Sequence, residues 1–587
     1  MSDASARGGA VRTLYPMHAR RAALLLALVA TSARADDADS VMYRDPELPL
    51  PRVVHQLPSR LPALWVEALG RPEADLKAQA AQAVARAHER GIAGMHVAVP
   101  ALSRELDRPD AHPTVRLAAA RALVVLDAKE SAAALARAAT ADADLHEFAD
   151  PALAGWDYKP ARAAWLDRIA RPPTSRGFVH AVRALGVVRE PAAATRLRDL
   201  ALDRTTPAAV RLEAARALAE IRTTGSEADA RALAAGTVPD RLVAAALLRR
   251  HGPDAVKGLQ ALGRDADPAV AAVALARLVE LDPGHVLPLL DAVLASPDSA
   301  VRGFGVEVLH RRPSAPHVRL LADRLSDPHP AVRRRARLAL HDQAKDWKAA
   351  VIGDAERVLA GSDWRGLEQA TLLLADLEHR PAAPRMLELL RHDRPEVLTT
   401  AAWGLRRLAE PGTLAPALGF FEQRYRGLSS PNPTNAAADV QLSHLAQFFG
   451  RAKYQHADEV LRKLATKGSP AGNPAGAEAR AAAAWALGLI HEGKGPPAVV
   501  TVLEGRLSAV NPGDLEDERV RQMAAVALGR MRAGEATLRR FYTDKRPGLN
   551  PVNNACGWAL ERVAGERYPA PGTVPVTARD WFLTPLD

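Results

Sequence analysis

One helical pattern recurs in fixed register along most of this chain of 587 residues. Seven segments align without gaps, with an apolar or small residue at offsets 4, 7 and 8 from the first residue. The segments begin at Val115, Val210, Val301, Val332, Val397, Val520 and Val552. These offsets place one apolar stripe on one face of a helix. Because a helical hairpin cannot bury such a stripe alone, the recurrence predicts a right-handed, all-α solenoid of about 13–14 helical hairpins.

The composition fits close-packed helices. Apolar residues make up 48% of the chain but aromatics only 4%, so the core is built largely from Ala, Leu and Val. Small residues at contact positions let helix axes approach, and no sustained alternating run indicates strands. The single cysteine, Cys556, occupies the offset-4 slot that six other helices fill with Ala or Gly. We therefore expect a small buried core residue there, with a reactive thiol as the alternative.

The N-terminus resembles an export signal. Met17 is followed by basic residues, by an apolar run from Ala22 to Ala30, and by Ala33 and Ala35 at a spacing typical of a cleavage site. We expect residues 1–35 to be a signal peptide cut after Ala35 and the mature protein to be periplasmic or secreted. The apolar run is too short for a membrane anchor. Met17 rather than Met1 is an alternative start.

Removal of the signal lowers the net charge. Residues 1–35 hold five Arg and one Asp, a net of +4, so the +10 of the whole chain becomes +6. Spread over the remaining chain, this is a mildly basic surface that gives little support for nucleic acid binding.

The pattern divides the chain into regions. Residues 36–60 are expected to form an extended lead-in, followed by repeats of short period over 61–395, repeats of 41-residue period over 396–565 and a C-terminal tail, 566–587. Within the first array, the helix pattern weakens over 142–176, where four aromatics cluster among prolines. We expect an irregular loop there, fastened to the solenoid by aromatic packing, and a ligand pocket is the alternative.

Two segments carry the pattern Asp-x-x-Pro-x-Val-Arg-x-x-Ala-x-x-Ala-Leu, one from Asp110 to Leu123 and one from Asp327 to Leu340. This pattern resembles HEAT repeats, of the short type also found in phycobilisome lyase subunits and related to armadillo-like helical folds. The resemblance implies that the Asp and the Arg form a ladder between repeats. The Arg position is held by Arg116, Arg211, Arg302, Arg333, Arg480 and Arg521. We interpret these arginines as structural rather than as a ligand-binding stripe.

The C-terminal array has two further features. Helices beginning at Val397, Ala438, Ala479 and Val520 follow one another at 41 residues, and the extra residues form Pro- and Asn-rich linkers containing Asn432, Asn473 and Asn511. Equivalent insertions in a solenoid emerge on one side, which predicts a ridge of loops. Offset 6 of these helices holds mostly aromatics, namely Trp403, His444, Trp485 and Trp558. These positions lie on a flank of the helix, where aromatics either fill the seam between repeats or bind a partner.

The sequence contains no catalytic motif, no cofactor motif and no metal-ligand spacing among its 18 His. It therefore predicts an exported, non-catalytic scaffold for protein–protein interaction. The proposed partner surface comprises Trp403, His444, Trp485, Trp558, Asn432, Asn473 and Asn511. Two alternatives remain open: a lyase-like enzyme or enzyme subunit that uses a groove of the solenoid, and a helical-repeat protein that binds nucleic acid. A small-molecule ligand also stays open.

Overall fold

The computed structural model describes residues 40–48, 52–56, 58–428, 436–467, 475–543, 550–567, 573–577 and 582–583. The signal peptide predicted for residues 1–35 lies outside them. The chain forms two compact units. Unit 1 is built on His55–Gly305 and includes the chain from Thr577 onward. Unit 2 is built on Val306–Val576 and includes Ala33–Val54.

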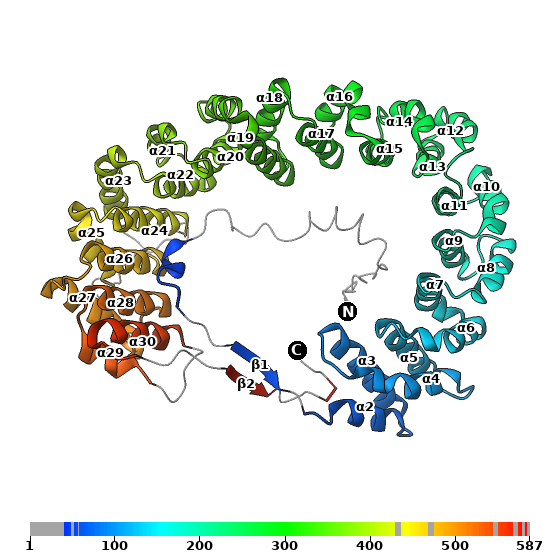
Figure 1. Cartoon of the computed structure of the whole chain (residues 1–587), viewed down its shortest axis with the longest axis horizontal. Coiled ribbons are helices and arrows are strands. Elements are labelled where there is room, and N and C mark those ends of the chain that lie inside the picture. Colours follow the sequence, from blue (N-terminus) through cyan, green and yellow to red (C-terminus); the bar gives the residue numbers. More distant parts are fainter. Residues whose placement is uncertain are drawn as a thin grey trace, which may run out of the picture. The chain divides into compact units, whose positions relative to one another are not determined.

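Unit 1 consists of helical hairpins in two layers (Figure 1). Its inner layer, on the concave side of this unit's own arc, contains α3 (Ala74–Glu89), α5 (Pro113–Val125), α7 (His146–Gly155), α9 (Phe178–Val187), α11 (Ala208–Ile221), α13 (Val238–Leu248) and α15 (Pro268–Leu281). Its outer layer contains α2 (Leu61–Leu69), α4 (Val99–Asp107), α6 (Ala132–Ala141), α8 (Ala161–Ala170), α10 (Ala194–Leu202), α12 (Glu227–Ala234), α14 (Val256–Leu262) and α16 (Leu290–Ala295). Helix α17 (Ser299–Arg311) spans the boundary of the two units.

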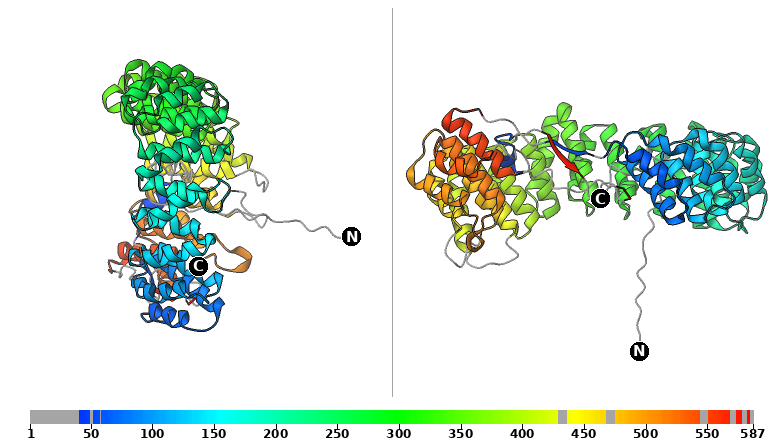
Figure 2. Two further views of the ribbon diagram at one scale, coloured as in Figure 1. Left: turned by 90° about the vertical axis from the view of Figure 1, so that its right-hand side faces the viewer. Right: turned by 90° about the horizontal axis from the view of Figure 1, so that it is seen from below.

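Unit 2 repeats this arrangement (Figures 1 and 2). It opens with α18 (Ala315–Asp323) and α19 (Pro330–Leu359), which is broken by non-helical backbone at Trp347. The inner layer of unit 2 is formed by α20 (Trp364–Asp376), α22 (Pro395–Leu408), α24 (Ala436–Arg451), α26 (Ala477–Ile490), α28 (Glu518–Met531) and α30 (Pro551–Ala564). The outer helices are α21 (Ala383–Leu389), α23 (Leu414–Gly427), α25 (Asp458–Ala465), α27 (Pro497–Leu507) and α29 (Glu535–Phe541).

Short elements connect the hairpins. The 3-10 helices are η2 (Val41–Arg44), η3 (Met95–Ala98), η4 (Lys129–Ser131), η5 (Ala143–Leu145), η6 (Pro191–Ala193), η7 (Pro253–Ala255), η8 (Pro283–Leu289), η9 (Arg324–Ser326), η10 (Arg380–Ala382), η11 (Pro411–Thr413), η13 (Gln455–Ala457) and η14 (Pro512–Asp514). Two strands, β1 (Arg52–Gln56) and β2 (Thr573–Thr577), pair outside the repeats. Among the described residues, the low strand content expected from the sequence is thus confirmed, apart from this two-stranded sheet.

Consecutive inner helices of unit 2 approach closely because small residues face one another. A Cβ added to any of three glycines would lie 2.6–2.7 Å from the Cα of an alanine on the next inner helix. The facing pairs are Gly450–Ala486, Gly488–Ala527 and Gly529–Ala559. Real Cβ atoms cannot come so close to backbone, so these glycines set the helix separation. The prediction of closely packed helices built on small residues is confirmed here.

Two local predictions have opposite outcomes. Cys556 is fully buried on α30, and its burial raises the pKa of the thiol to about 12, as expected for a core residue. The loop predicted over 142–176 is wrong, because this stretch forms α7 and α8. Trp165 of α8 is buried and donates a hydrogen bond from Nε1 to Asp150 of α7 at 2.8 Å, so the expected aromatic packing joins two helices of the array.

The repeated arginines are structural, as expected, and they make two kinds of contact. Arg211 donates a hydrogen bond to Asp240 at 2.6 Å, and Arg480 donates one to Glu516 at 2.9 Å. Arg116 lies 3.8 Å from Asp142. Arg302, Arg333 and Arg521 donate to the backbone carbonyls of Ser296, Asp327 and Leu507 respectively, and Arg333 also lies 4.0 Å from Glu368 of α20. The arginines at this position therefore both join repeats and bind carbonyls near helix ends.

Candidate partner-binding site

The N-terminal residues of the described chain lie on the inner layer of unit 2 (Figure 1). We call residues 40–48, which contain η2, the N-terminal strap. Met42 of the strap is fully buried, although it lies outside the repeats. Hydrogen bonds join the strap to α24, α26 and α28 in turn. The inner layer of these three helices therefore holds a segment of chain that is not part of any hairpin.

Gln447 of α24 holds the first residues of the strap. Its Oε1 accepts a hydrogen bond from the backbone N–H of Val41 at 2.9 Å, and its Nε2 donates one to Ser40 Oγ at 2.7 Å. Arg406 of α22 donates to the same Oε1 at 2.6 Å, and Nε2 also donates to Ser443 at 2.9 Å. Gln447 is fully buried, so this amide is fixed in orientation by its neighbours before it meets the strap.

Tyr43 of the strap contacts the first turn of α26. Its hydroxyl donates a hydrogen bond to Glu478 Oε2 at 2.7 Å, and Arg519 of α28 lies 3.5 Å from the same carboxylate. Burial and the adjacent Glu478 raise the pKa of Tyr43, so the phenol stays protonated and remains a donor at any physiological pH.

Asp45 is held by two side chains. Arg530 of α28 donates hydrogen bonds from Nη2 to the Asp45 carbonyl at 3.0 Å and to its carboxylate at 2.7 Å. The Trp485 indole N–H of α26 donates to the same carbonyl. The Arg530 guanidinium also lies over the Trp485 ring, 5.3 Å from its centroid. Burial lowers the pKa of Arg530, and the carboxylate of Asp45 offsets that cost.

The structure places the sequence-predicted aromatic residues on the inner layer, where three of the four are buried. Trp403, His444 and Trp485 are 4%, 2% and 0% exposed, whereas Trp558 is partly exposed. The rings of Trp485 and Trp558 lie against Gly450 and Gly529 of the preceding inner helices. These rings fill seams between repeats, and Trp485 in addition contacts the strap. A role for the set in binding a separate partner stays a prediction.

His444 differs from its tryptophan equivalents. Neither ring nitrogen has a hydrogen-bond partner. Burial and the neighbouring Arg406 guanidinium lower the pKa of His444 to about 3. The imidazole is therefore neutral at physiological pH and acts as an apolar filler with two unused polar atoms.

The predicted loop ridge is only partly described. Asn432 and Asn473 lie outside the described residues. Asn511 is exposed and precedes η14. Lys467 donates a hydrogen bond to the Leu515 carbonyl at 2.7 Å and lies 3.4 Å from Asp514. The linkers that follow α25 and α27 therefore touch, in agreement with stacked loops.

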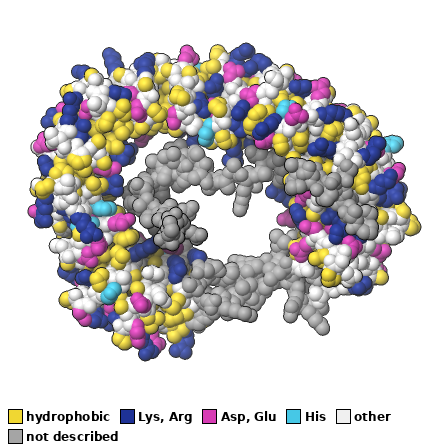
Figure 3. Space-filling model, turned by 180° about the vertical axis from the view of Figure 1, so that it is seen from behind, with side chains coloured by type: hydrophobic (Ala, Val, Ile, Leu, Met, Phe, Trp, Pro, Cys, Tyr) yellow, Lys and Arg dark blue, Asp and Glu magenta, His cyan; other side chains and the backbone are white. Residues whose placement is uncertain are grey.

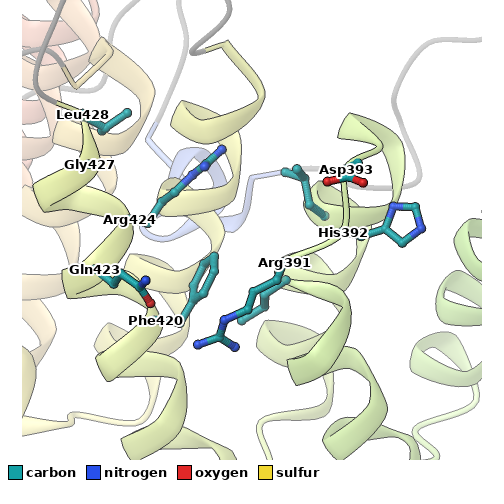
Figure 4. Close-up of a pocket in the computed structure, with 10 residues that line it drawn as sticks. Arg391, His392, Asp393, Phe420, Gln423, Arg424, Gly427 and Leu428 are labelled. Carbon is teal, nitrogen blue, oxygen red and sulfur yellow. The ribbon is translucent and has the colours of Figure 1, made fainter.

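A hollow of about 500 Å³ lies beside α22 and α23 (Figure 4). Arg391 lies over the Phe420 ring, 5.2 Å from its centroid, and Arg424 carries a buried Nε that has no hydrogen-bond partner. Its lining also includes His392 and Asp393. The hollow therefore presents cationic and aromatic contacts together with one imidazole and one carboxylate.

The described residues contain neither a cluster of metal-binding side chains nor a helix that could span a membrane. In that part of the chain, no group of three or more His, Cys, Asp or Glu side chains is arranged to hold a metal ion. None of the described helices combines the length and apolar character needed to cross a bilayer.

No family model and no curated protein matches the chain. Similar solved structures include importin beta in an ammonium sulfate condition, with 15% identity over 86% of this chain and 72% of that chain and a TM-score of 0.47. Yeast importin-beta (Kap95p) has 14% identity over the same shares and a TM-score of 0.47. Kap121p has 13% identity over 87% of this chain and 57% of that chain, with a TM-score of 0.45.

Identities and TM-scores at this level carry no information on function. The fold is defined by the helices of the chain: each of its two units is an array of stacked α-helical hairpins, and the repeat pattern of the sequence resembles that of HEAT repeats.

The sequence reasoning missed the residues that hold the strap. Gln447, Glu478 and Arg530 lie on helices whose apolar stripes were recognised, but none of the three belongs to a repeated position. Gln447 and Arg530 are polar residues buried on inner helices. A buried polar residue is costly without a partner, so polar residues on the inner helices, which on α24 also include Gln441, Ser443 and His444, are the signal that could have found them.

Proposed function

We propose that this protein is an exported, non-catalytic HEAT-repeat scaffold that binds a protein partner on the inner layer of unit 2. The observation that carries the proposal is the strap, a peptide segment with one short 3-10 helix that is held there by side chains of three consecutive inner helices. A surface built in this way can bind peptide without a deep pocket. Figure 3 shows basic and acidic side chains interspersed on the face of the molecule that is drawn there, so the described residues of that face form no continuous basic stripe of the kind that binds nucleic acid.

Site-specific photo-crosslinking tests this function. A photoreactive residue replaces Arg519, which lies on α28 beside the strap contact Glu478. The control replaces Thr501, an exposed residue of the outer helix α27. We expect one protein adduct from position 519 and none from position 501 in cells that make the protein. Equal adducts from both positions, or adducts from position 501 alone, would place the partner elsewhere.

The export part of the proposal rests on the basic start, the apolar run and the Ala33/Ala35 spacing. We expect the mature N-terminus at Asp36, and N-terminal sequencing of the protein isolated from its native cells checks this. Recovery of an uncleaved chain from the cytoplasm would contradict export. It would also make nucleic acid a possible partner again.

A further inference from the structure

The strap is recognised partly through its backbone. Gln447 accepts from the N–H of Val41, and Trp485 and Arg530 donate to the carbonyl of Asp45. The strap forms the 3-10 helix η2 over Val41–Arg44, and these backbone groups are the same in any segment that adopts this turn. These contacts would therefore serve a segment of another chain as well as they serve the strap.

Two strap side chains add sequence preference. Tyr43 donates to the Glu478 carboxylate, and the Asp45 carboxylate accepts from Arg530 at 2.7 Å. A hydrogen bond to a charged group contributes more than one between neutral groups, so both contacts discriminate between sequences. They select a phenol followed two residues later by a carboxylate.

One donor of the side chain that holds Asp45 has no hydrogen-bond partner. Arg530 is buried, with a side chain 6% exposed, and its Nη1 has no hydrogen-bond partner. A donor left without an acceptor in a buried site is a cost that a better-fitting segment removes.

We propose that the strap is an internal stand-in for a partner, and that the groove formed by Gln447, Glu478, Trp485 and Arg530 binds in trans a peptide that forms the same short 3-10 helix and carries the pattern Tyr-x-Asp. This inference rests on the proposed scaffold function and names the chemistry of the partner segment. The strap then competes with the partner from within the same chain, at an effective concentration of about 1 mM for a tethered segment. A partner segment enters by displacing it.

The test uses full-length protein and a fluorescent peptide that copies residues 38–48. The chain carrying Tyr43→Ala and Asp45→Ala has a weakened strap but an intact groove. We expect it to bind the peptide at least about tenfold more tightly than the wild-type chain does, in an anisotropy titration. A peptide carrying the Asp45→Ala change should bind that chain at least about tenfold more weakly than the original peptide.

Exchanging the charges at Arg530 and Asp45 distinguishes a loss of peptide recognition from a loss of folding. Adding Arg530→Glu to the weakened-strap chain should abolish binding of the original peptide and restore binding of a peptide with Asp45→Arg. Equal peptide binding by wild-type and weakened-strap chains, or a peptide affinity insensitive to Asp45, would overturn the inference. Dimers of the wild-type chain formed by exchanged straps would assign the groove to a second copy and overturn it too.

The two proposals fail in different ways. If the peptide behaves as expected but the photo-crosslinked partner maps away from position 519, the groove is a peptide site and the scaffold function is wrong. If the partner maps to position 519 but the peptide results are negative, the scaffold function stands and the Tyr-x-Asp pattern is wrong.

Discussion

Replacing Leu528 with alanine is expected to lower the free energy of unfolding of unit 2 by about 2–5 kcal/mol. Leu528 lies at offset 8 of α28 and is fully buried. Since α28 packs between α26 and α30, a cavity at this position weakens two repeat interfaces at once. Denaturant unfolding followed by circular dichroism measures the change.

The matched control is Leu338→Ala. Leu338 lies on α19 and is 48% exposed, so its truncation should change stability by less than about 0.5 kcal/mol. A loss at Leu528 no larger than the loss at Leu338 would show that the stripe is not the core of the array.

Acid should destabilise the protein through His444. The pKa of His444 is about 3 in the folded chain and about 6.5 when unfolded. Below pH 6.5 His444 is therefore protonated in the unfolded chain but not in the folded chain. The free energy of unfolding falls by about 1.4 kcal/mol per pH unit until the pKa of the folded state is reached. At pH 4.5 this loss amounts to about 3 kcal/mol relative to pH 7.

His444→Leu should remove this loss, and the variant should be at least as stable as wild type at pH 7, since two unpartnered nitrogens leave the core. Urea unfolding of both proteins at pH 7 and pH 4.5 gives the difference, which cancels the effect of other titrating groups. His341→Leu, at an exposed position of α19, should keep the wild-type pH dependence. Parallel stability–pH curves for wild type and His444→Leu would show that His444 is not the acid-sensitive group.

Helix register was predictable because it is local. Val397, Ala438, Ala479 and Val520 are each the third residue of α22, α24, α26 and α28, as the 41-residue spacing predicts. A stripe of apolar residues at helical spacing needs no information from distant chain. The same logic placed Cys556 in the core, because its slot holds Ala or Gly in the other helices.

Predictions based on helix-breaking residues and on flank positions were less successful. Pro151 lies inside α7, where the clustered prolines had suggested a loop, because tertiary packing around Asp150 and Trp165 outweighs the local preference. Residues at offset 6, including Trp485, were expected on a flank of the helix, away from the apolar stripe. The Gly–Ala approach between inner helices turns that flank into a seam, so Trp485 is buried. That approach depends on a neighbouring repeat and is not visible within one helix.

The strap had no signal in the sequence, because its partners lie far away along the chain. Val41 and Gln447 are separated by 406 residues, and Asp45 and Arg530 by 485. Neither the strap nor its partners repeat, so a search for periodicity passes over both.

These separations along the sequence also determine the order in which parts of the chain reach their final positions. Hairpins form from neighbouring residues and can fold as they are made, whereas residues 40–48 are synthesised about 20–80 s before Gln447, at 5–20 residues per second. The first part of the described chain to emerge is thus among the last to reach its final position. Docking of the strap requires α24, α26 and α28 to be in place together. A strap bound in the groove therefore indicates that these helices of unit 2 have folded.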